Sequence, residues 1–344
     1  MTKSLKSTRR NFLKLAGLAG LGALTTFGIS RRENFKSTPI TKLVRKTQHS
    51  RYALGTRVSI AAIHDSQSLA ENAIGAAYED LDAMEKIFTR FSADSHVCEL
   101  NKTRTLAHLP DEMLSVLEAC QYFHRDTKGA FDITVQPILD LFAKSYERGK
   151  EPSEADIQSI LPSIGADKLQ VRGRSLYLSA EGMALSFDGV VPGYIADRAA
   201  RILEGYGIKR YLVDAGGELR ASGNGPSGGA WRVAVQDPKK EQNYPAVISL
   251  DRGAVSTSGS YESFYSDNGD FHHIVNAKTG RSPAQTTSVT VLAPTAIEAD
   301  ILSTALFVMP ITEGLAYINA RPQYSCLIIE KDGALFKSDN FAFS

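Results

Sequence analysis

The chain has 344 residues, of which 43% are hydrophobic and 22% charged, with 27 Gly and 13 Pro. This length is enough to bury a core of ordinary size in one or two lobes, and the composition excludes disordered and collagen-like proteins. The three cysteines lie far apart and in no zinc-binding spacing, so we expect neither a disulfide scaffold nor a thiolate metal site.

The net charge of +1 conceals an uneven distribution, because residues 1–32 carry seven of the 39 Lys and Arg side chains and no acidic one. The rest of the chain therefore has 32 basic against 38 acidic side chains. A mildly acidic body lacks the basic stripe that displaces counterions from a nucleic acid. We expect no nucleic-acid partner.

Residues 1–32 resemble a twin-arginine export signal, since Arg9 and Arg10 precede a weakly apolar run over 15–29 that is rich in Gly and Ala. The alternative is an ordinary basic N-terminus before a helix. The signal predicts a periplasmic protein. No clear cleavage site precedes Arg31, and an uncleaved signal would tether the protein to the membrane.

The chain after the signal begins with a polar arm over 33–50, and 51–344 forms the folded domain. Alternation predicts a strand over 52–63, and apolar residues at helical spacing predict helices over 68–88 and 111–127. The stretch 143–168 is rich in charge, Pro and Ser, which is typical of an excursion between lobes.

The second half of the chain is dominated by short strand-like pieces. They are expected at 176–178, 183–187, 210–213, 231–236, 246–250, 254–258, 273–275 and 287–292. A helix over 196–206 interrupts them, and another begins after Thr295. Strands in hairpin-like succession with a few helices predict an α+β fold, with mainly antiparallel sheets flanked by helices.

A capping box marks the start of the last of these helices, because Thr295 and Glu298 can satisfy each other's backbone amides. The helix then presents Asp300 and Thr304 on one face, and hard oxygen ligands of this kind suit Mg²⁺. Taken alone, the pair more often represents a solvated Asp and a Thr bonded back to the helix.

Three further segments could contribute to a site. His273 ends an expected strand and could act as a base near neutral pH, although a surface His in a loop is the commoner case. The turn 214–218 has the sequence Asp-Ala-Gly-Gly-Glu, which would suit a close backbone approach to a ligand or a plain hairpin. The run 129–137 places Phe131 and Asp132 among small and apolar residues, which also fits a core Phe beside a capping Asp.

Taken in order, these segments resemble the ApbE family of FAD:protein FMN transferases. The matching pieces span the chain after the signal and lie at 53–56, 91–95 with 100–101, 129–137, 193–194 with Asp197, 211–223, Trp231 with 237–238, 254–259, 273–281 and 288–306. An ordered set of this kind is far more specific than any single motif. The resemblance implies the family's two-lobed α+β fold.

The resemblance also implies an activity and a set of site residues. Family members use Mg²⁺ to split FAD and attach FMN through its phosphate to a Thr of an acceptor flavoprotein. Here the acceptor would be a subunit of an exported or membrane electron-transfer complex. His273 would be the general base, and Gly189, Asp300 and Thr304 would hold Mg²⁺. The FAD site would comprise Leu54, Phe91, Ala130, Phe131, Asp132, Ser186, Pro192 and Ile274.

One segment departs from the family's pattern. The family usually has Asp where this chain has Ser186, and Lys or another polar residue where it has Pro192; Asp188 falls two positions later. Two alternatives therefore stay open. The chain could be an FAD pyrophosphatase that releases free FMN and AMP, or a non-catalytic flavin-binding accessory protein that lost turnover at Ser186 and Pro192.

Overall fold

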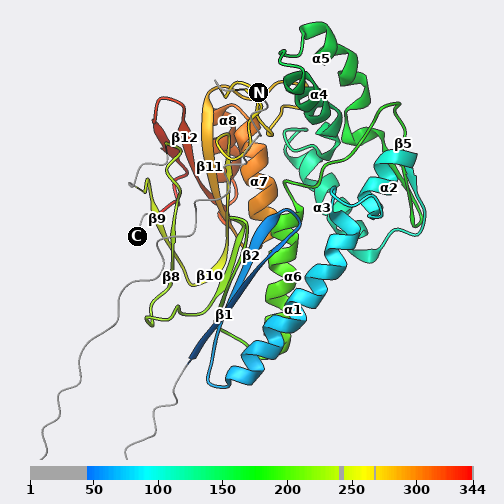
Figure 1. Cartoon of the computed structure of the whole chain (residues 1–344). Helices are drawn as coiled ribbons and strands as arrows, with labels where there is room; N and C mark the ends of the chain where they lie inside the picture. The colour runs from blue at the N-terminus through cyan, green and yellow to red at the C-terminus, as the bar shows by residue number, and fades with distance from the viewer. Residues whose placement is uncertain (1–44, 240–243, 267–268, 343–344) are drawn as a thin grey trace, which may run out of the picture. The chain divides into compact units, whose positions relative to one another are not determined.

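The structure is a computed structural model that describes residues 45–239, 244–266 and 269–342. The expected export signal and residues 33–44 of the expected arm lie outside these ranges. The largest sheet has eight strands, in the order β1-β2-β6-β7-β10-β11-β12-β13, and each neighbouring pair is antiparallel (Figure 1). These strands are β1 (Arg45–Ala53), β2 (Thr56–His64), β6 (Tyr211–Ala215), β7 (Leu219–Ser222), β10 (Arg252–Gly259), β11 (Thr286–Ala293), β12 (Ser325–Glu330) and β13 (Leu335–Lys337).

The two faces of this sheet are covered differently. Helices α1 (Gln67–Phe88), α6 (Val191–Gly205) and α7 (Ala296–Val308) pack against one another and against one face, while α8 (Ile311–Asn319) packs beside β12. The other face is covered by a two-stranded sheet of β8 (Trp231–Ala234) and β9 (Val247–Leu250), whose Trp231 and Ile248 are buried with Val255 and Leu327. The α+β prediction with mainly antiparallel sheets is confirmed.

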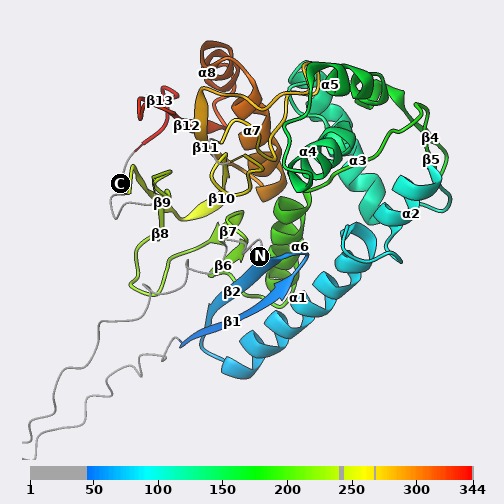
Figure 2. The ribbon, with the colours of Figure 1, turned by 45° about the horizontal axis from the view of Figure 1, so that its top comes forward.

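A mainly helical region lies on the side of α6 and α7 remote from β8 and β9 (Figures 1 and 2). It contains α2 (His96–Thr103), α3 (Asp111–Asp126), α4 (Gln136–Glu147) and α5 (Glu154–Ile160), together with a small sheet in the order β3-β5-β4. The bounds of these strands are Thr105–Leu106, Leu169–Arg172 and Ser175–Leu178 for β3, β4 and β5. Short 3₁₀ turns occupy Ile133–Val135, Leu161–Ser163 and Ala166–Lys168.

Strong local signals produced the elements that the sequence predicted. The apolar residues of α1 recur every three or four positions and are buried, and the Ser66 hydroxyl caps its first turn by accepting from the Leu69 amide. Helix α7 begins at the predicted capping box, with both reciprocal hydrogen bonds between Thr295 and Glu298 present.

Several expected elements differ in the structure. The strand predicted over 52–63 is two strands of a hairpin, because the chain turns at Leu54 and Gly55, where φ is positive. Residues 45–50, expected in the polar arm, belong to β1. The stretch 143–168, expected as an excursion, contains the end of α4, α5 and two short 3₁₀ turns, and Ile157 of α5 is fully buried against α4. Helix α6 begins at Val191 rather than 196 because Pro192 is tolerated in a first turn, where no intrahelical amide bond is lost.

The segments 183–187 and 273–275 are not strands, although both were predicted as such. Short apolar runs bury equally well in irregular loops, and Met183, Leu185 and Phe187 are core residues without a strand partner. Within the described ranges, no helix combines the length and apolar character needed to span a membrane.

Candidate active site

Helix α7 carries the two side chains expected to hold a metal, and its start is fixed from two sides. Besides the capping box, the Asp197 carboxylate of α6 accepts hydrogen bonds from the Ala296 and Ile297 amides, both at 2.9 Å. A carboxylate at a helix N-terminus also interacts favourably with the helix dipole. These two hydrogen bonds connect α6 to α7, so that the position of Asp300 depends on both helices.

Asp300 is only 3% exposed, and its Oδ2 accepts a hydrogen bond from the Gly193 amide at 2.9 Å. The two helices meet closely here, because a Cβ on Gly193 would lie 2.4 Å from the Ala296 carbonyl oxygen. Burial raises the pKa of Asp300, and the nearby Asp188 charge adds to the rise. Burial likewise raises the pKa of Glu218, with Asp300 as the next cause.

Thr304 lies one turn after Asp300 and faces Gly189. A Cβ on Gly189 would approach Thr304 Oγ1 to 3.0 Å, so the backbone of this residue is held against the hydroxyl. The Ser258 hydroxyl of β10 lies 3.3 Å from Thr304 Oγ1 and 2.8 Å from Ser303 Oγ. The structure therefore brings together Gly189, Asp300 and Thr304. Ser258 was not predicted here, because nothing in a strand's sequence shows which helix it will face.

These donors suit a magnesium ion. Asp300 forms no ion pair with a Lys or Arg among the described residues, and a buried carboxylate without a cationic partner is costly. A divalent cation would offset that charge. In the described ranges no three Asp, Glu, His or Cys side chains form a metal-binding group. Mg²⁺ does not require one, since it commonly takes one or two carboxylates and completes its shell with water and phosphate oxygens.

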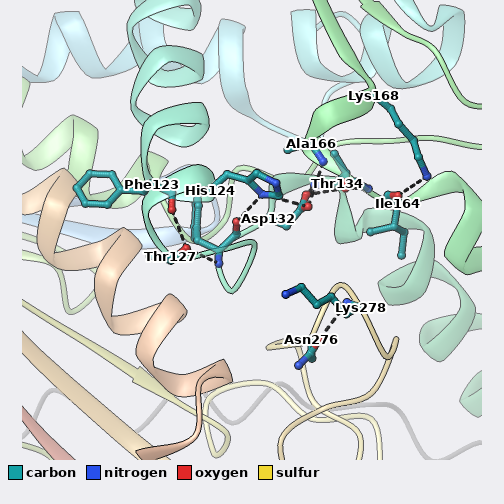
Figure 3. A network of polar contacts seen from close by, with 12 residues as sticks. Phe123, His124, Thr127, Asp132, Thr134, Ile164, Ala166, Lys168, Asn276 and Lys278 are labelled. Atoms are coloured by element: carbon teal, nitrogen blue, oxygen red, sulfur yellow. Dashed lines mark hydrogen bonds and ion pairs between the residues drawn. The ribbon is translucent and has the colours of Figure 1, made fainter. Parts of the chain in front are cut away.

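The loop that follows α3 borders this cluster. Phe131 is buried, and its Cε2 lies 3.8 Å from the position of a Cβ on Gly189. Ala130 is half-buried beside it. On the other side of the loop, Lys278 Cε comes within 3.5 Å of the position of a Cβ on Gly129. Lys278 lies in the turn after Asn276, and its amide donates to Asn276 Oδ1 at 2.9 Å (Figure 3).

Asp132 has a structural task in this loop (Figure 3). Its Oδ1 accepts from the Thr134 amide at 2.8 Å and from the Thr134 hydroxyl at 2.6 Å, and its Oδ2 accepts from the Ala166 amide at 3.1 Å. His124 Nδ1 lies 3.4 Å from the same Oδ2. The carboxylate is thus engaged by the protein and holds the loop that carries Ala130 and Phe131.

Leu54 and Phe91 form another side of the candidate site. The Leu54 amide donates to Glu85 Oε1 at 3.1 Å, and the Phe91 ring lies directly against Gly55, where a Cβ would approach it to 2.8 Å. Phe91 is 71% exposed, so its ring is available to stack on a ligand. The neighbouring Arg90 reaches Asp188 at 3.3 Å, which connects this side to the segment that carries Gly189.

Ser186 and Pro192 flank that segment. The Ser186 amide donates to the Ile133 carbonyl at 2.8 Å, and its hydroxyl accepts from the Asp188 amide at 3.3 Å. Pro192 occupies the first turn of α6. Ile274, also predicted to line the FAD site, is buried in the main hydrophobic cluster, and its amide donates to His272 Nδ1 at 3.3 Å.

The two adjacent histidines have different surroundings. His272 is 1% exposed, its Nε2 lies 3.1 Å from the Pro283 carbonyl, and burial lowers its pKa to about 4. His273 is half-buried, and its Nδ1 lies 2.9 Å from the Ser263 carbonyl. A carbonyl can only accept, so Nδ1 of neutral His273 carries the proton and Nε2 keeps its lone pair. His273 is therefore the histidine able to accept a proton.

Comparison with known proteins shows the family to which the chain belongs. The sequence pattern of the ApbE family matches residues 54–328, and the chain belongs to that family. The relatives include the FAD:protein FMN transferase of Salmonella typhimurium, which is 34% identical over 269 residues, or 75% of this chain and 77% of the relative. The corresponding protein of Escherichia coli K12 is 33% identical over 75% of this chain and 76% of its own.

Solved structures show the same fold. The ApbE protein of Thermotoga maritima superposes with a TM-score of 0.78 at 30% identity, covering 86% of this chain and 98% of that one. The flavin transferase ApbE of Vibrio cholerae has a TM-score of 0.74 at 26% identity, covering 87% and 98%. The ApbE-like fold predicted from the sequence is confirmed.

Proposed function

We propose that this protein is a Mg²⁺-dependent FAD:protein FMN transferase that attaches FMN through its phosphate to a Thr of an acceptor flavoprotein. The observation that carries the proposal is the meeting of Gly189, Asp300 and Thr304 next to the Ala130–Phe131 loop. The relatives named FAD:protein FMN transferase support it. Mg²⁺ bound to these oxygens would neutralise charge on the FAD pyrophosphate.

In the reaction, the acceptor Thr hydroxyl attacks the phosphorus of the FMN half of FAD. The bond from that phosphorus to the bridging oxygen breaks, and AMP leaves with the bond's electron pair. His273 Nε2 takes the hydroxyl proton as the new phosphoester forms, because a Thr hydroxyl is a poor nucleophile without a base. The Ser263 carbonyl, by accepting from Nδ1, keeps the ring in the tautomer that this step needs.

His272 cannot replace His273 in this role. Its Nε2 is engaged with the Pro283 carbonyl and its Nδ1 accepts from the Ile274 amide, so both ring nitrogens are already used. Its lowered pKa also makes it a weak base.

The pyrophosphatase alternative has one observation in its favour. His273 is half-exposed and could take a proton from water as well as from a Thr hydroxyl. The accessory-protein alternative is favoured by Ser186, because a hydroxyl that accepts from the Asp188 amide replaces the charge usual in the family.

One experiment separates the three functions. The purified chain is incubated with FAD, Mg²⁺ and a flavin-free, Thr-bearing acceptor flavoprotein, and the acceptor mass is measured together with free FMN and AMP. An FMN-sized adduct with equimolar AMP supports the transferase. Free FMN and AMP without an adduct would identify a pyrophosphatase, and intact bound FAD an accessory protein.

Residues 1–32 support a proposal about location. Arg9 and Arg10 ahead of a weakly apolar run favour twin-arginine export to the periplasm, with membrane tethering if the signal stays uncleaved. The acceptor would then be a flavoprotein subunit of an exported or membrane-bound electron-transfer complex.

A further inference from the structure

A groove lies beside the His273 loop and outside the set of residues expected to hold FAD and Mg²⁺. It has a volume of about 550 Å³ and is lined by described residues within 260–264 and 269–272 after β10, 283–287 at the start of β11, 237–239 and 244–245 after β8, and the β12–β13 hairpin. Of the twelve residues assigned to FAD, metal or catalysis, none lines it. The groove is therefore not required for the functions already described.

The rim of this groove is unusually apolar for an exposed surface. Three large side chains that line it are exposed to solvent: Tyr244 at 60%, Phe264 at 50% and Leu335 at 51%. Exposed apolar residues gathered around one concavity mark a binding site, and aromatic side chains are enriched where proteins meet.

The charges of the groove argue against a nucleotide ligand. Lys239 and Lys331 are matched by Asp237 and Glu330 in the same lining, and Lys331 also pairs with Asp270 at 3.5 Å. A dinucleotide's phosphates need an excess of positive donors or a helix N-terminus, and the lining offers no net positive charge. A peptide segment with apolar side chains fits these walls better.

One stretch of chain connects the groove to the loop that carries His273. At its start, Ser258 contacts Thr304, which is expected to bind the metal. The next residues, Ser260, Tyr261 and Phe264, line the groove. Between them, the Ser263 carbonyl accepts a hydrogen bond from His273. Phe264 also forms a β-bridge with His272, which is itself part of the lining. A protein chain that presents a hydroxyl to His273 can therefore place neighbouring residues in the groove.

We propose that this groove docks the acceptor flavoprotein, by receiving apolar side chains next to the Thr that is modified. This inference rests on the proposed transferase function. A volume of about 550 Å³ holds a few side chains of an extended segment. Tyr244, Phe264 and Leu335 would then determine which protein is flavinylated, while the FAD site determines what is transferred.

The test uses Tyr244→Ala and Leu335→Glu, which alter the rim without touching the loop from Ser258 to His273. Tyr206→Ala and Val171→Glu are matched controls, since these side chains are similarly exposed elsewhere, at 44% and 40%. The probe is the flavin-free acceptor that the wild-type chain modifies in the mass assay. The KM for that acceptor and the KM for FAD are measured separately, and sedimentation reports the oligomeric state.

Removal of an interface anchor commonly weakens binding about tenfold or more. We expect the rim variants to raise the acceptor KM by about that factor, with kcat and the KM for FAD unchanged and both controls normal. An unchanged acceptor KM in both rim variants overturns the docking role. A raised KM for FAD would assign the groove to the dinucleotide, and a dimer lost only in the rim variants would assign it to a second copy of this chain. If the wild type modifies no acceptor while releasing FMN, the transferase proposal itself fails and the docking role fails with it.

Discussion

The contact of α6 with α7 at Gly193 makes a sharp test of how Asp300 is positioned beside Thr304 and Gly189. In Gly193→Ala, the new Cβ would lie 2.4 Å from the Ala296 carbonyl oxygen, 2.7 Å from its carbon and 2.8 Å from Asp300 Cβ. Two of these neighbours are backbone atoms that cannot rotate away. Because ordinary contacts begin near 3.4 Å, the helices must separate by about 1 Å.

Two effects follow from that separation. Overpacking of a close-packed interior costs about 1–3 kcal/mol, and the hydrogen bond from the Gly193 amide to Asp300 is stretched, which adds about 1 kcal/mol or more. We therefore expect the free energy of unfolding to fall by about 3 kcal/mol. Asp300 would also move relative to Thr304, and a displacement of about 1 Å can reduce a rate about 100-fold.

Urea unfolding and FMN transfer are the two assays, and Gly75→Ala is the control. Gly75 lies within α1, and a Cβ there would meet nothing within 4 Å. Alanine is the better helix former, so this variant should gain about 0.5–1 kcal/mol and keep its activity. If Gly193→Ala is as stable and as active as the wild type, the close approach of the helices and its role in positioning Asp300 are both refuted.

Four further predictions concern single groups. Asp300→Asn should lose most transfer activity and recover only weakly with added Mg²⁺. Normal turnover of this variant at low Mg²⁺ would show that Asp300 does not bind the metal. His273→Ala should slow transfer about 10²- to 10⁴-fold with FAD binding close to normal, and an unchanged transfer rate would remove His273 from the role of base. Burial lowers the pKa of His272 from the usual 6.5 to about 4 in the folded protein. Between these two pH values the unfolded chain binds a proton at His272 that the folded protein does not. The free energy of unfolding should therefore fall as the pH drops from 6.5 to about 4. This loss of unfolding free energy, up to about 3 kcal/mol, should be absent from His272→Gln when both proteins are unfolded in urea across this pH range. Changing Arg9 and Arg10 to Lys should keep the protein out of the periplasm, and an unchanged periplasmic yield would exclude the twin-arginine route.

Elements with strong local signals could be predicted from the sequence, because their determinants lie within a few residues of one another. Periodicity defined α1, and the capping box of Thr295 and Glu298 defined the start of α7. The pairing of Asp300 with Thr304 on one helical face follows directly from helix geometry. These predictions needed no knowledge of the tertiary structure.

The rest of the site depends on contacts that no local pattern contains. Gly193 and Asp300 are 107 positions apart, and Ser258 and Thr304 are 46 positions apart. The resemblance assigns Asp132 and Ile274 to the FAD site; in the structure the Asp132 carboxylate caps a turn and Ile274 is buried, and their contact with FAD stays a prediction. A motif identifies the residues of a region without showing which of them face a ligand.

Ser186 and Pro192, the two departures from the family's sequence pattern, both preserve the backbone of their segment. Ser186 still holds the Ile133 carbonyl through its amide, and Pro192 still opens α6 in a first turn that needs no amide there. The backbone between them therefore still brings Gly189 to Thr304 and Gly193 to Asp300. What changes is the side-chain chemistry along this segment, where the family's usual charges are replaced by a hydroxyl and a ring. Because the backbone keeps Gly189, Thr304 and Asp300 in place without those charges, we expect the departures to weaken ground-state binding of FAD more than the chemical step.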